Sequence, residues 1–332
     1  MKKYIILLLT SSLFLLTSCN ADLRELCYDH SHSGGAGNVS LVLNLQLDLQ
    51  LDFPVSVEDH TALLPPTYMK ANFYDINDGH LVKTEYVGTY GGPISVPPGT
   101  YDMVVYAFGT EWTQIRGENH KNTLEAFTSD ITTLKASTLA AARRGGEADP
   151  DPDDPIIYTP DHLLVARERV TIPEATGVNQ VVTITASAST IIETYLFDLT
   201  NVEGIEYVQS VDAFVTNQAS SNFFGRGEVN QKACTINFPV EVVSGEGVLR
   251  TTFNTFGKLP GESHSYLHIV LTGTGGQIVT VSTDITDQFL KGDHEIIIDT
   301  PVDIPPPPAG EGGGIAPTVD PWDEINQDVP IG

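Results

Sequence analysis

Residues 38 to 53 read NVSLVLNLQLDLQLDF, and from Val39 to Phe53 every odd-numbered residue is apolar. The even-numbered residues between them are polar, except for Val42. Successive side chains of a β-strand point to opposite faces, so this alternation gives one apolar face, whereas no helical register gathers the leucines on one stripe. We therefore predict a single strand over residues 39–53. At about 3.3 Å per residue it would be roughly 50 Å long, against a usual strand length of about 5–6 residues.

The first residues have the form of a secretory signal sequence. MKKYIILLLTSSLFLLTSC combines two lysines with an apolar run from Tyr4 to Leu16, which is short for a membrane span. The residues before Cys19 are similar to the lipobox of bacterial lipoproteins, in which the cysteine is acylated and becomes the mature N-terminus. The alternative is a cleaved signal beside an ordinary cysteine. We predict a signal peptide over residues 1–18, lipidation of Cys19, a tether over residues 19–38, and stable attachment to a membrane through the lipid.

Charge excludes one class of partner. Without residues 1–18 the chain has 15 basic and 43 acidic side chains, a formal charge of −28. Binding nucleic acid requires clustered Lys and Arg, so we expect no nucleic acid partner. Besides Cys19 the chain contains Cys27 and Cys234. The sequence does not decide whether Cys27 and Cys234 form a disulfide, because two cysteines so far apart define no disulfide framework.

Strand and turn signals recur along the rest of the chain. Asn77-Asp78-Gly79 predicts a hairpin, and Pro97-Pro98-Gly99 predicts a turn before a strand over residues 101–108. No amphipathic helix longer than two turns is expected, although residues 133–144 are locally permissive. Short strands with turn signals at about 8–12-residue spacing are typical of β-sandwiches.

We predict an all-β fold of two tandem β-sandwich domains, residues 39–175 and 178–302. RRGGEADPDPDDP, residues 143–155, is too polar and too rich in Pro and Gly to pack, which predicts a flexible acidic loop in the first domain. Residues 303–332 form a Pro/Gly linker and a tail. Docking of this tail on the second domain is favoured over a role as a donor strand, because DPWDEINQDVPI alternates poorly.

No catalytic constellation is present in the sequence. The chain lacks a Gly-x-Ser-x-Gly elbow, a His-Glu-x-x-His pair and a Walker loop. GRGEVN, residues 225–230, lacks the third glycine of a dinucleotide motif. We therefore expect a non-catalytic protein without a cofactor.

Metal binding is not expected either. CYDHSH, residues 27–32, places four candidate ligands within a tether, too close together to surround a zinc ion well. The alternating aspartates of the acidic loop lack the Gly and Glu that an EF-hand needs. His264 and His268 share a probable strand face but show no ligand spacing.

Several segments together resemble an uncharacterised lipoprotein family of the Bacteroidetes. Beside the lipobox they are RELCYDHSH, PPGTYDMVVYAFGTE, RGENHKNTLEAF, NVEGIEYVQSVDA, TFNTFG, DITDQF and GGGIAPTVDPWDEI. That family is similar to the fimbrillin-like adhesins and fimbrial anchor lipoproteins of the same bacteria, with a lipidated N-terminus and two transthyretin-like β-sandwich domains. The resemblance implies a fimbria-related protein that is lipid-anchored on the outer membrane at the cell surface. Its pilin-like partner subunits would join by β-augmentation, in which one chain's strand completes another chain's sheet. Function carried across this likeness is analogy.

The resemblance implies a role for the long strand. Its leucines are the candidate strand-exchange surface: Leu41, Leu43, Leu45, Leu47, Leu49 and Leu51. The alternative is an ordinary edge or bent strand with a bulge. Stem pilins of this superfamily lose an N-terminal strand by cleavage at arginine, but here no arginine occurs between Arg24 and Arg116. An anchor or accessory subunit that keeps its first strand is therefore favoured, with Arg143 and Arg144 as the candidate processing site in the loop.

A glycan-binding outer-membrane lipoprotein is the competing hypothesis. Such a protein would need exposed aromatic platforms, and the chain has two tryptophans, Trp112 and Trp322. The sequence identifies neither a host ligand nor a glycan.

Overall fold

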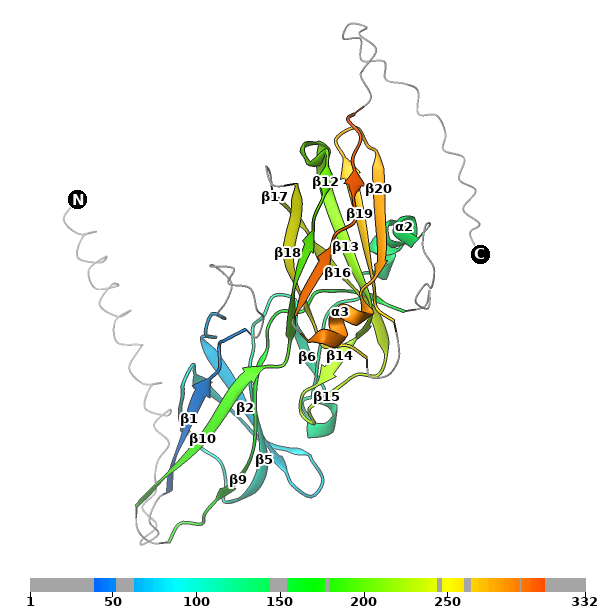
Figure 1. Ribbon diagram of the computed structural model, residues 1–332. Helices are drawn as coiled ribbons and strands as arrows, with labels where there is room; N and C mark the ends of the chain where they lie inside the picture. Colours follow the sequence, from blue (N-terminus) through cyan, green and yellow to red (C-terminus); the bar gives the residue numbers. More distant parts are fainter. Residues whose placement is uncertain are drawn as a thin grey trace, which may run out of the picture.

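The structure is a computed structural model that describes residues 39–51, 63–143, 154–176, 179–243, 247–259, 264–292 and 294–307. Within these residues the chain is built almost entirely of β-strands, which form two units placed end to end (Figure 1). The predicted all-β class with sandwich-like packing is confirmed.

The first unit is a flattened ring of seven strands. In ring order they are β1 (Val39–Leu47), β10 (Gln180–Thr190), β9 (Leu164–Ile172), β5 (Gly99–Ala107), β2 (Tyr68–Asp75), β3 (Leu81–Gly88) and β4 (Gly91–Ile94). Two short contacts close the ring: Gly88 pairs with Gly91, and Val165 and Leu164 pair with Ser189 and Thr190. The ring therefore behaves as two packed sheets, β10-β1-β4 and β9-β5-β2-β3.

The predicted hairpin joins β2 to β3. The Asp75 carboxylate accepts a hydrogen bond from the Asn77 N–H at 2.7 Å, and Gly79 adopts a φ of 75°. Short polar side chains that bond to nearby backbone, followed by a glycine that tolerates positive φ, make this turn. The hairpin prediction is confirmed.

The second unit packs two larger sheets face to face. One contains β17 (Glu241–Val243), β18 (Val248–Thr255), β11 (Glu193–Leu199) and β21 (Glu295–Ile298). The other contains β20 (Ile278–Asp284), β19 (Tyr266–Gly273), β13 (Val208–Ala219), β16 (Ala233–Pro239) and β8 (Ile156–Tyr158). Phe238 of β16 stacks on Phe253 of β18 with ring centroids 4.4 Å apart, so aromatic side chains fill the space between the sheets.

Smaller elements complete the second unit and the junction. Two short sheets are formed by β15 (Glu228–Val229), β14 (Ser221–Phe223), β7 (Glu125–Phe127) and β6 (Gln114–Arg116), and by β12 (Val202–Glu203) and β22 (Val302–Asp303). The helical elements are η1 (Lys121–Thr123), α2 (Thr132–Arg143), η2 (Ile205–Tyr207) and α3 (Thr286–Lys291).

The absence of a helix longer than two turns was a wrong expectation, since α2 has 12 residues. The Asp130 carboxylate accepts hydrogen bonds from the N–H and the hydroxyl of Thr132, which caps the first turn. Leu139 and Ala142 are buried. The alanine-rich sequence has high helix propensity, and packing against β19 and β20 supplies the remaining stabilisation.

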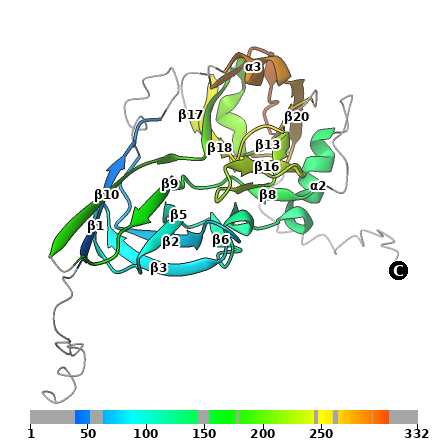
Figure 2. The ribbon, with the colours of Figure 1, turned by 90° about the horizontal axis from the view of Figure 1, so that it is seen from below.

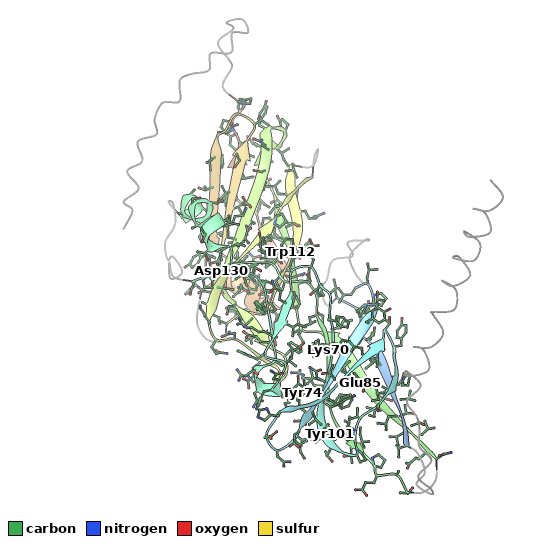
Figure 3. All side chains as sticks on the ribbon, turned by 180° about the vertical axis from the view of Figure 1, so that it is seen from behind. Lys70, Tyr74, Glu85, Tyr101, Trp112 and Asp130 are labelled. Atoms are coloured by element: carbon green, nitrogen blue, oxygen red, sulfur yellow. The ribbon has the colours of Figure 1, made fainter. Side chains whose placement is uncertain are left out.

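Strand pairing crosses the limits of the two predicted domains, 39–175 and 178–302. β10, expected to open the second domain, pairs with β1 in the first ring. The segment from β6 to β8, expected in the first domain, pairs with β14 and β16 of the second unit. Figure 2, seen from below, shows α2 and β8 beside the second unit, and Figure 3 shows Trp112 and Asp130 there, with Lys70, Tyr74 and Tyr101 in the first. The limits 39–175 and 178–302 stay a prediction from the sequence, and each of the two units takes strands from both of these ranges.

Candidate functional site

The predicted strand-exchange segment lies inside the first unit as β1, paired on both sides. It runs parallel to β10 over its whole length, from Val39 opposite Gln180 to Leu47 opposite Ala188. On its other side it is antiparallel to β4. β1 is therefore an interior strand of its sheet and not an edge strand.

The alternation of the sequence corresponds to an inner and an outer face. Leu41, Leu43 and Leu45 are 5%, 1% and 3% exposed, whereas Asn44 and Gln46 point to solvent. Leu47, Leu49 and Leu51 are half-buried. At about 1.5–3 kcal/mol per fully buried leucine, the three inner leucines make β1 a large contributor to the stability of the unit.

The predicted length of this strand was wrong, because β1 ends at Leu47 after nine residues. The Asp48 carboxylate accepts a hydrogen bond from the Gln50 N–H at 3.2 Å. Such a local side-chain to backbone bond competes with a strand ladder, so a polar residue that alternates correctly in the sequence still ends the strand. Phe53, the last residue of the predicted strand, lies outside the described residues.

A glycine permits β4 to approach β1. Gly91 has a φ of 98°, and a Cβ atom at this position would lie 2.0 Å from the Leu43 carbonyl oxygen. A larger residue would separate the two backbones, so the pairing on this side of β1 depends on Gly91.

The second unit contacts the outer face of the first through two loops. Phe224 is fully buried and meets Tyr106 of β5 edge to face, with ring centroids 5.1 Å apart. The loop between β6 and η1 places Glu118 over β2 and β5. The two units are therefore joined through side chains as well as through the chain connections.

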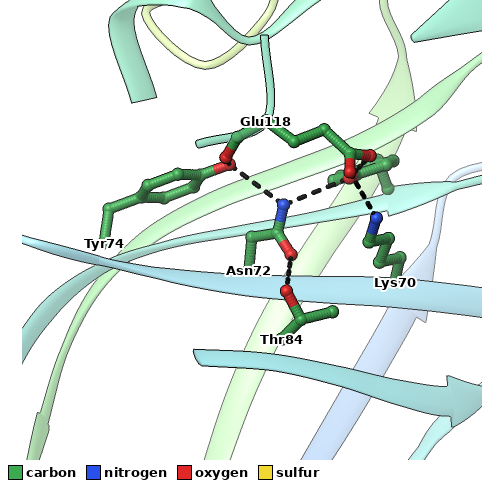
Figure 4. Close-up of polar contacts among 6 residues, drawn as sticks. Lys70, Asn72, Tyr74, Thr84 and Glu118 are labelled. Atoms are coloured by element: carbon green, nitrogen blue, oxygen red, sulfur yellow. Dashed lines mark hydrogen bonds and ion pairs between the residues drawn. The ribbon is translucent and has the colours of Figure 1, made fainter. Parts of the chain in front are cut away.

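A polar network surrounds Glu118 (Figure 4). Its carboxylate accepts hydrogen bonds from Lys70 Nζ and from the Tyr106 hydroxyl, both at 2.6 Å. Its main-chain carbonyl accepts a hydrogen bond from the Tyr74 hydroxyl at 3.1 Å. The Asn72 amide donates to the hydroxyls of Tyr74 and Tyr106 and accepts from Thr84. Every member of this network has a partner, which is the condition under which buried polar groups stabilise a fold.

The network shifts the pKa values of its members. Partial burial acts to raise the pKa of Glu118, but the hydrogen bonds from Lys70 and Tyr106 hold it below its usual range. Burial raises the pKa of Tyr74 to about 12 and raises that of Tyr106 further, helped by its bond to Glu118. Glu118 is therefore a carboxylate and both tyrosines are neutral at ordinary pH.

Several predicted residues lie outside the described residues: Cys19, Cys27, Asp29, His30, His32, Arg144 and Trp322. Lipidation, the Cys27–Cys234 pairing, the acidic loop and the role of the tail therefore stay predictions. Arg143 is the last residue of α2. Cys234 is fully buried in β16, and burial raises the pKa of its thiol, which disfavours the reactive thiolate.

The remaining candidates have structural roles. His264 lies 2.8 Å from Asp284, and His268 is buried and bonds Ser282. In the part of the chain that the structure describes, no group of three or more His, Cys, Asp or Glu residues could hold a metal ion. Over the same residues no helix is long and apolar enough to cross a membrane.

Sequence reasoning missed the Glu118 network and the loop of residues 223–227 that carries Phe224. RGENHKNTLEAF, residues 116–127, contains Glu118, but in the sequence it indicates only the family resemblance. The signal that could have located the contact is the pair of glycines in FFGRGE, residues 223–228, because closely spaced glycines permit close backbone approach.

Comparison with known proteins yields one full-length relative and several similar folds. The chain is 25% identical over 370 residues to a provisionally assigned fimbrium anchoring subunit, Fim4B, of Bacteroides ovatus, and the match covers 99% of this chain and 98% of that protein. A provisionally assigned adhesin from Bacteroides ovatus has a TM-score of 0.54 at 20% identity, covering 80% of this chain and 94% of that chain. This likeness shows a shared fold.

The fimbrial anchor protein Mfa2 from Porphyromonas gingivalis is also similar, at a TM-score of 0.46 and 14% identity, covering 78% of this chain and 88% of that one. The full-length match to the fimbrium anchoring subunit confirms the resemblance to fimbrillin-like adhesins and fimbrial anchor proteins. A family described as a domain of unknown function (DUF5119) matches residues 18–239, which is well over half of the chain. The protein belongs to this family.

Proposed function

We propose that the protein is a non-catalytic anchoring or accessory subunit of a fimbria, held on the outer membrane by lipid on Cys19. In this proposal its partners are other fimbrial subunits, joined to it by an added β-strand. The observation that carries the proposal is the relative provisionally assigned as a fimbrium anchoring subunit, which matches this chain over nearly its full length.

The position of β1 decides how a partner strand could join this sheet. β1 lies between β4 and β10, with buried leucines on one face and ladder pairs on both edges. A strand from another subunit with the same alternation would satisfy the same backbone groups and fill the same apolar positions only if it replaced β1 there. The candidate strand-exchange surface is therefore the site that Leu41, Leu43 and Leu45 occupy in this chain, continued by Leu47, Leu49 and Leu51.

The distribution of arginines supports an anchor over a stem subunit. No arginine lies between Arg24 and Arg116, so cleavage at arginine cannot remove β1 close to its own C-terminal end. Cleavage at Arg24 would separate the chain from its lipid and leave β1 in place. Arg143 and Arg144 stay the proposed processing site in the loop after α2.

The first test is mass spectrometry of the protein purified from intact membranes of cells that make it. A photo-crosslinking residue replaces Asn44 or Gln46, whose side chains point outward from β1, and Lys232 of the second unit serves as the control position. We expect an acylated N-terminus at Cys19 and a second fimbrial subunit crosslinked at residue 44 or 46 but not at 232. An acylated protein with no subunit at any position would refute the proposal.

A second candidate function, glycan binding, has one observation in its favour. A cavity of about 600 Å³ opens at the junction of the units, and two exposed aromatic residues, Tyr68 and Phe108, line it together with Asn254, Thr110 and Thr252. Aromatic faces beside amide and hydroxyl groups suit sugar rings. Retention of the protein on a polysaccharide affinity gel, lost in Tyr68→Ala and Phe108→Ala variants, would favour this function.

A further inference from the structure

A cationic depression lies on the outer face of the first unit, although the whole chain is strongly acidic. It has a volume of about 520 Å³, and β5, β9, η1 and the loop after β14 line it. Its charged lining residues are four cations, Lys121, Arg167, Arg169 and Arg226, and two carboxylates, Asp102 and Glu168, so cations outnumber carboxylates there in a chain with net charge −26. Clustering of so many scarce cations at one place indicates a partner of opposite charge.

Two glycines place Arg226 at the rim of this depression. A Cβ atom on Gly225 would lie 2.0 Å from the Lys121 carbonyl oxygen, and one on Gly227 would lie 1.8 Å from Arg167 Nη1. Gly227 also has a φ of 75°. The Gly-Arg-Gly sequence of residues 225–227 therefore packs closely against η1 and against Arg167 of β9 and leaves the Arg226 side chain exposed between its two glycines.

The local carboxylates do not neutralise all four cations. Asp102 is shared, since its carboxylate lies 2.5 Å from Lys121 Nζ and 2.9 Å from Arg169 Nε. Arg226 pairs with Glu228 at 2.9 Å, an exposed pair of little energetic weight. Arg167 is exposed and makes no ion pair within the described residues. A guanidinium of this kind is available to a carboxylate from outside the chain.

The depression adjoins an incompletely paired strand edge. β9 pairs with β5 from Gly99 opposite Ile172 to Tyr106 opposite Val165. On its other side, within the described residues, β9 pairs with β10 only at Leu164 and Val165. Among the described residues, the edge of residues 166–172 thus presents main-chain donors and acceptors without a ladder, which is the feature that an added strand recognises.

We propose that the residue 166–172 edge of β9 accepts an extended acidic segment of a partner subunit, whose outward-facing carboxylates pair with Arg167, Arg169 and Arg226. This proposal rests on the proposed function, because it supplies a second contact between fimbrial subunits, separate from the β1 site. Arg167 and Arg169 are two residues apart on one face of β9, so every second residue of an added strand would lie opposite them. The free strand edge favours a peptide over a lipid headgroup or an acidic glycan, neither of which can extend a sheet.

The test uses the folded full chain and a soluble probe. The probe is a fluorescent eight-residue peptide that alternates Glu with Val or Thr, and its control has Lys in place of every Glu. We expect the Glu peptide to bind and the Lys peptide not to bind. A double variant, Arg167→Glu with Arg226→Glu, should weaken binding of the Glu peptide at least about tenfold, because two attractive pairs become repulsive. The matched control, Lys232→Glu, reverses an exposed charge in the second unit and should change the affinity less than about twofold.

A second readout separates strand addition from simple charge attraction. Hydrogen exchange of the main-chain amides of residues 166–172 should slow when the Glu peptide is bound, because an added strand would pair with them. Equal binding of the Glu peptide to the double variant, or no protection of residues 166–172, would overturn the proposal. Charge-dependent binding to phosphatidylglycerol vesicles without binding of the peptide would also overturn it in favour of a membrane contact.

Failure of this proposal can be distinguished from failure of the proposed function. The peptide assay needs neither lipid on Cys19 nor a native fimbria, and the crosslinking test at Asn44 and Gln46 concerns the other sheet of the unit. A positive crosslink from β1 with a negative peptide assay would leave the fimbrial role intact and remove only the contact at β9.

Discussion

Two strands of the first unit, β1 and β9, differ in how completely they are paired with their neighbours. At one side β4 covers β1, and Gly91 permits the close approach that the pairing needs. At the other side β9 and β10 pair over two residues and then separate. The first side buries leucines and the second exposes arginines. The difference teaches that one sandwich can hold its own first strand firmly while leaving another edge available to a partner.

The largest effect should come from β1. Leu43→Ala removes a side chain that is 1% exposed and leaves a cavity between the two sheets, so we expect a loss of about 2–5 kcal/mol in the free energy of unfolding. Asn44→Ala, at the neighbouring outward position, should cost less than about 0.5 kcal/mol. Urea unfolding measures both. Equal costs for the two variants would show that β1 is not part of the core.

The second effect concerns the polar network that joins the units. Glu118→Gln removes the carboxylate that Lys70 and Tyr106 bond, and we expect a loss of about 1.5–3 kcal/mol, the usual value of hydrogen bonds to charged groups. Glu85→Gln is the control, because Glu85 makes a single 3.3 Å ion pair with the partly exposed Lys83. An equally large loss of unfolding free energy in Glu85→Gln would show that removing any negative charge from this unit is destabilising, and that the Glu118 hydrogen bonds are not the cause.

The network also predicts a pH dependence. The pKa of Glu118 is lower in the folded state than in the unfolded chain, so the unfolded state binds more protons as the pH falls. Its contribution is full above the unfolded pKa, near 4.5, and is lost as the pH falls through the folded pKa. The difference in unfolding free energy between wild type and Glu118→Gln should therefore shrink below about pH 4.5. A constant difference down to pH 3 would contradict this cause.

A smaller effect is expected at the loop beside β9. Gly227→Ala places a Cβ atom at a φ of 75° and against Arg167, so we expect a loss of about 1 kcal/mol in stability together with displacement of the Arg167 guanidinium. Gly109→Ala is the matched control, because Gly109 has a φ of 82° but nothing lies within 4 Å of its Cβ position. The fall in melting temperature of Gly109→Ala measures the cost of a positive φ alone. Any additional fall in Gly227→Ala measures the contact with Arg167.

The sequence predicts the local elements of this fold better than their assembly. Alternation over residues 39–47 gave β1 with the correct inner face, and the Asn-Asp-Gly turn gave the β2–β3 hairpin, because both signals depend on neighbouring residues. The bond from Gln50 to Asp48 that ends β1 depends on the same neighbours but leaves the alternation intact. The placement of β10 beside β1, 141 residues apart at Leu43 and Ile184, has no local signal, because long-range pairing is decided by packing.

The candidate sites divide in the same way. The leucines of β1 could be selected from their spacing alone. Glu118, Tyr106 and Asn72 could not, because they come from β2, β5 and a loop that reaches β2 only in the folded chain. Lys121, Arg167 and Arg226 are likewise scattered over about a hundred residues and meet only because Gly225 and Gly227 permit a loop of the second unit to lie on the first.

The smallest effect should come from the open side of the unit. Arg167→Ala removes an exposed side chain without an ion pair among the described residues, so the free energy of unfolding should change by less than about 0.5 kcal/mol. Arg169→Ala breaks the pair with Asp102, which Lys121 still contacts, and should lower the free energy of unfolding more than Arg167→Ala does. If Arg167→Ala costs more than Arg169→Ala in urea unfolding, Arg167 stabilises the isolated chain. Arg167 would then serve the stability of the fold, and the β9 edge would no longer differ from β1 in being available to a partner.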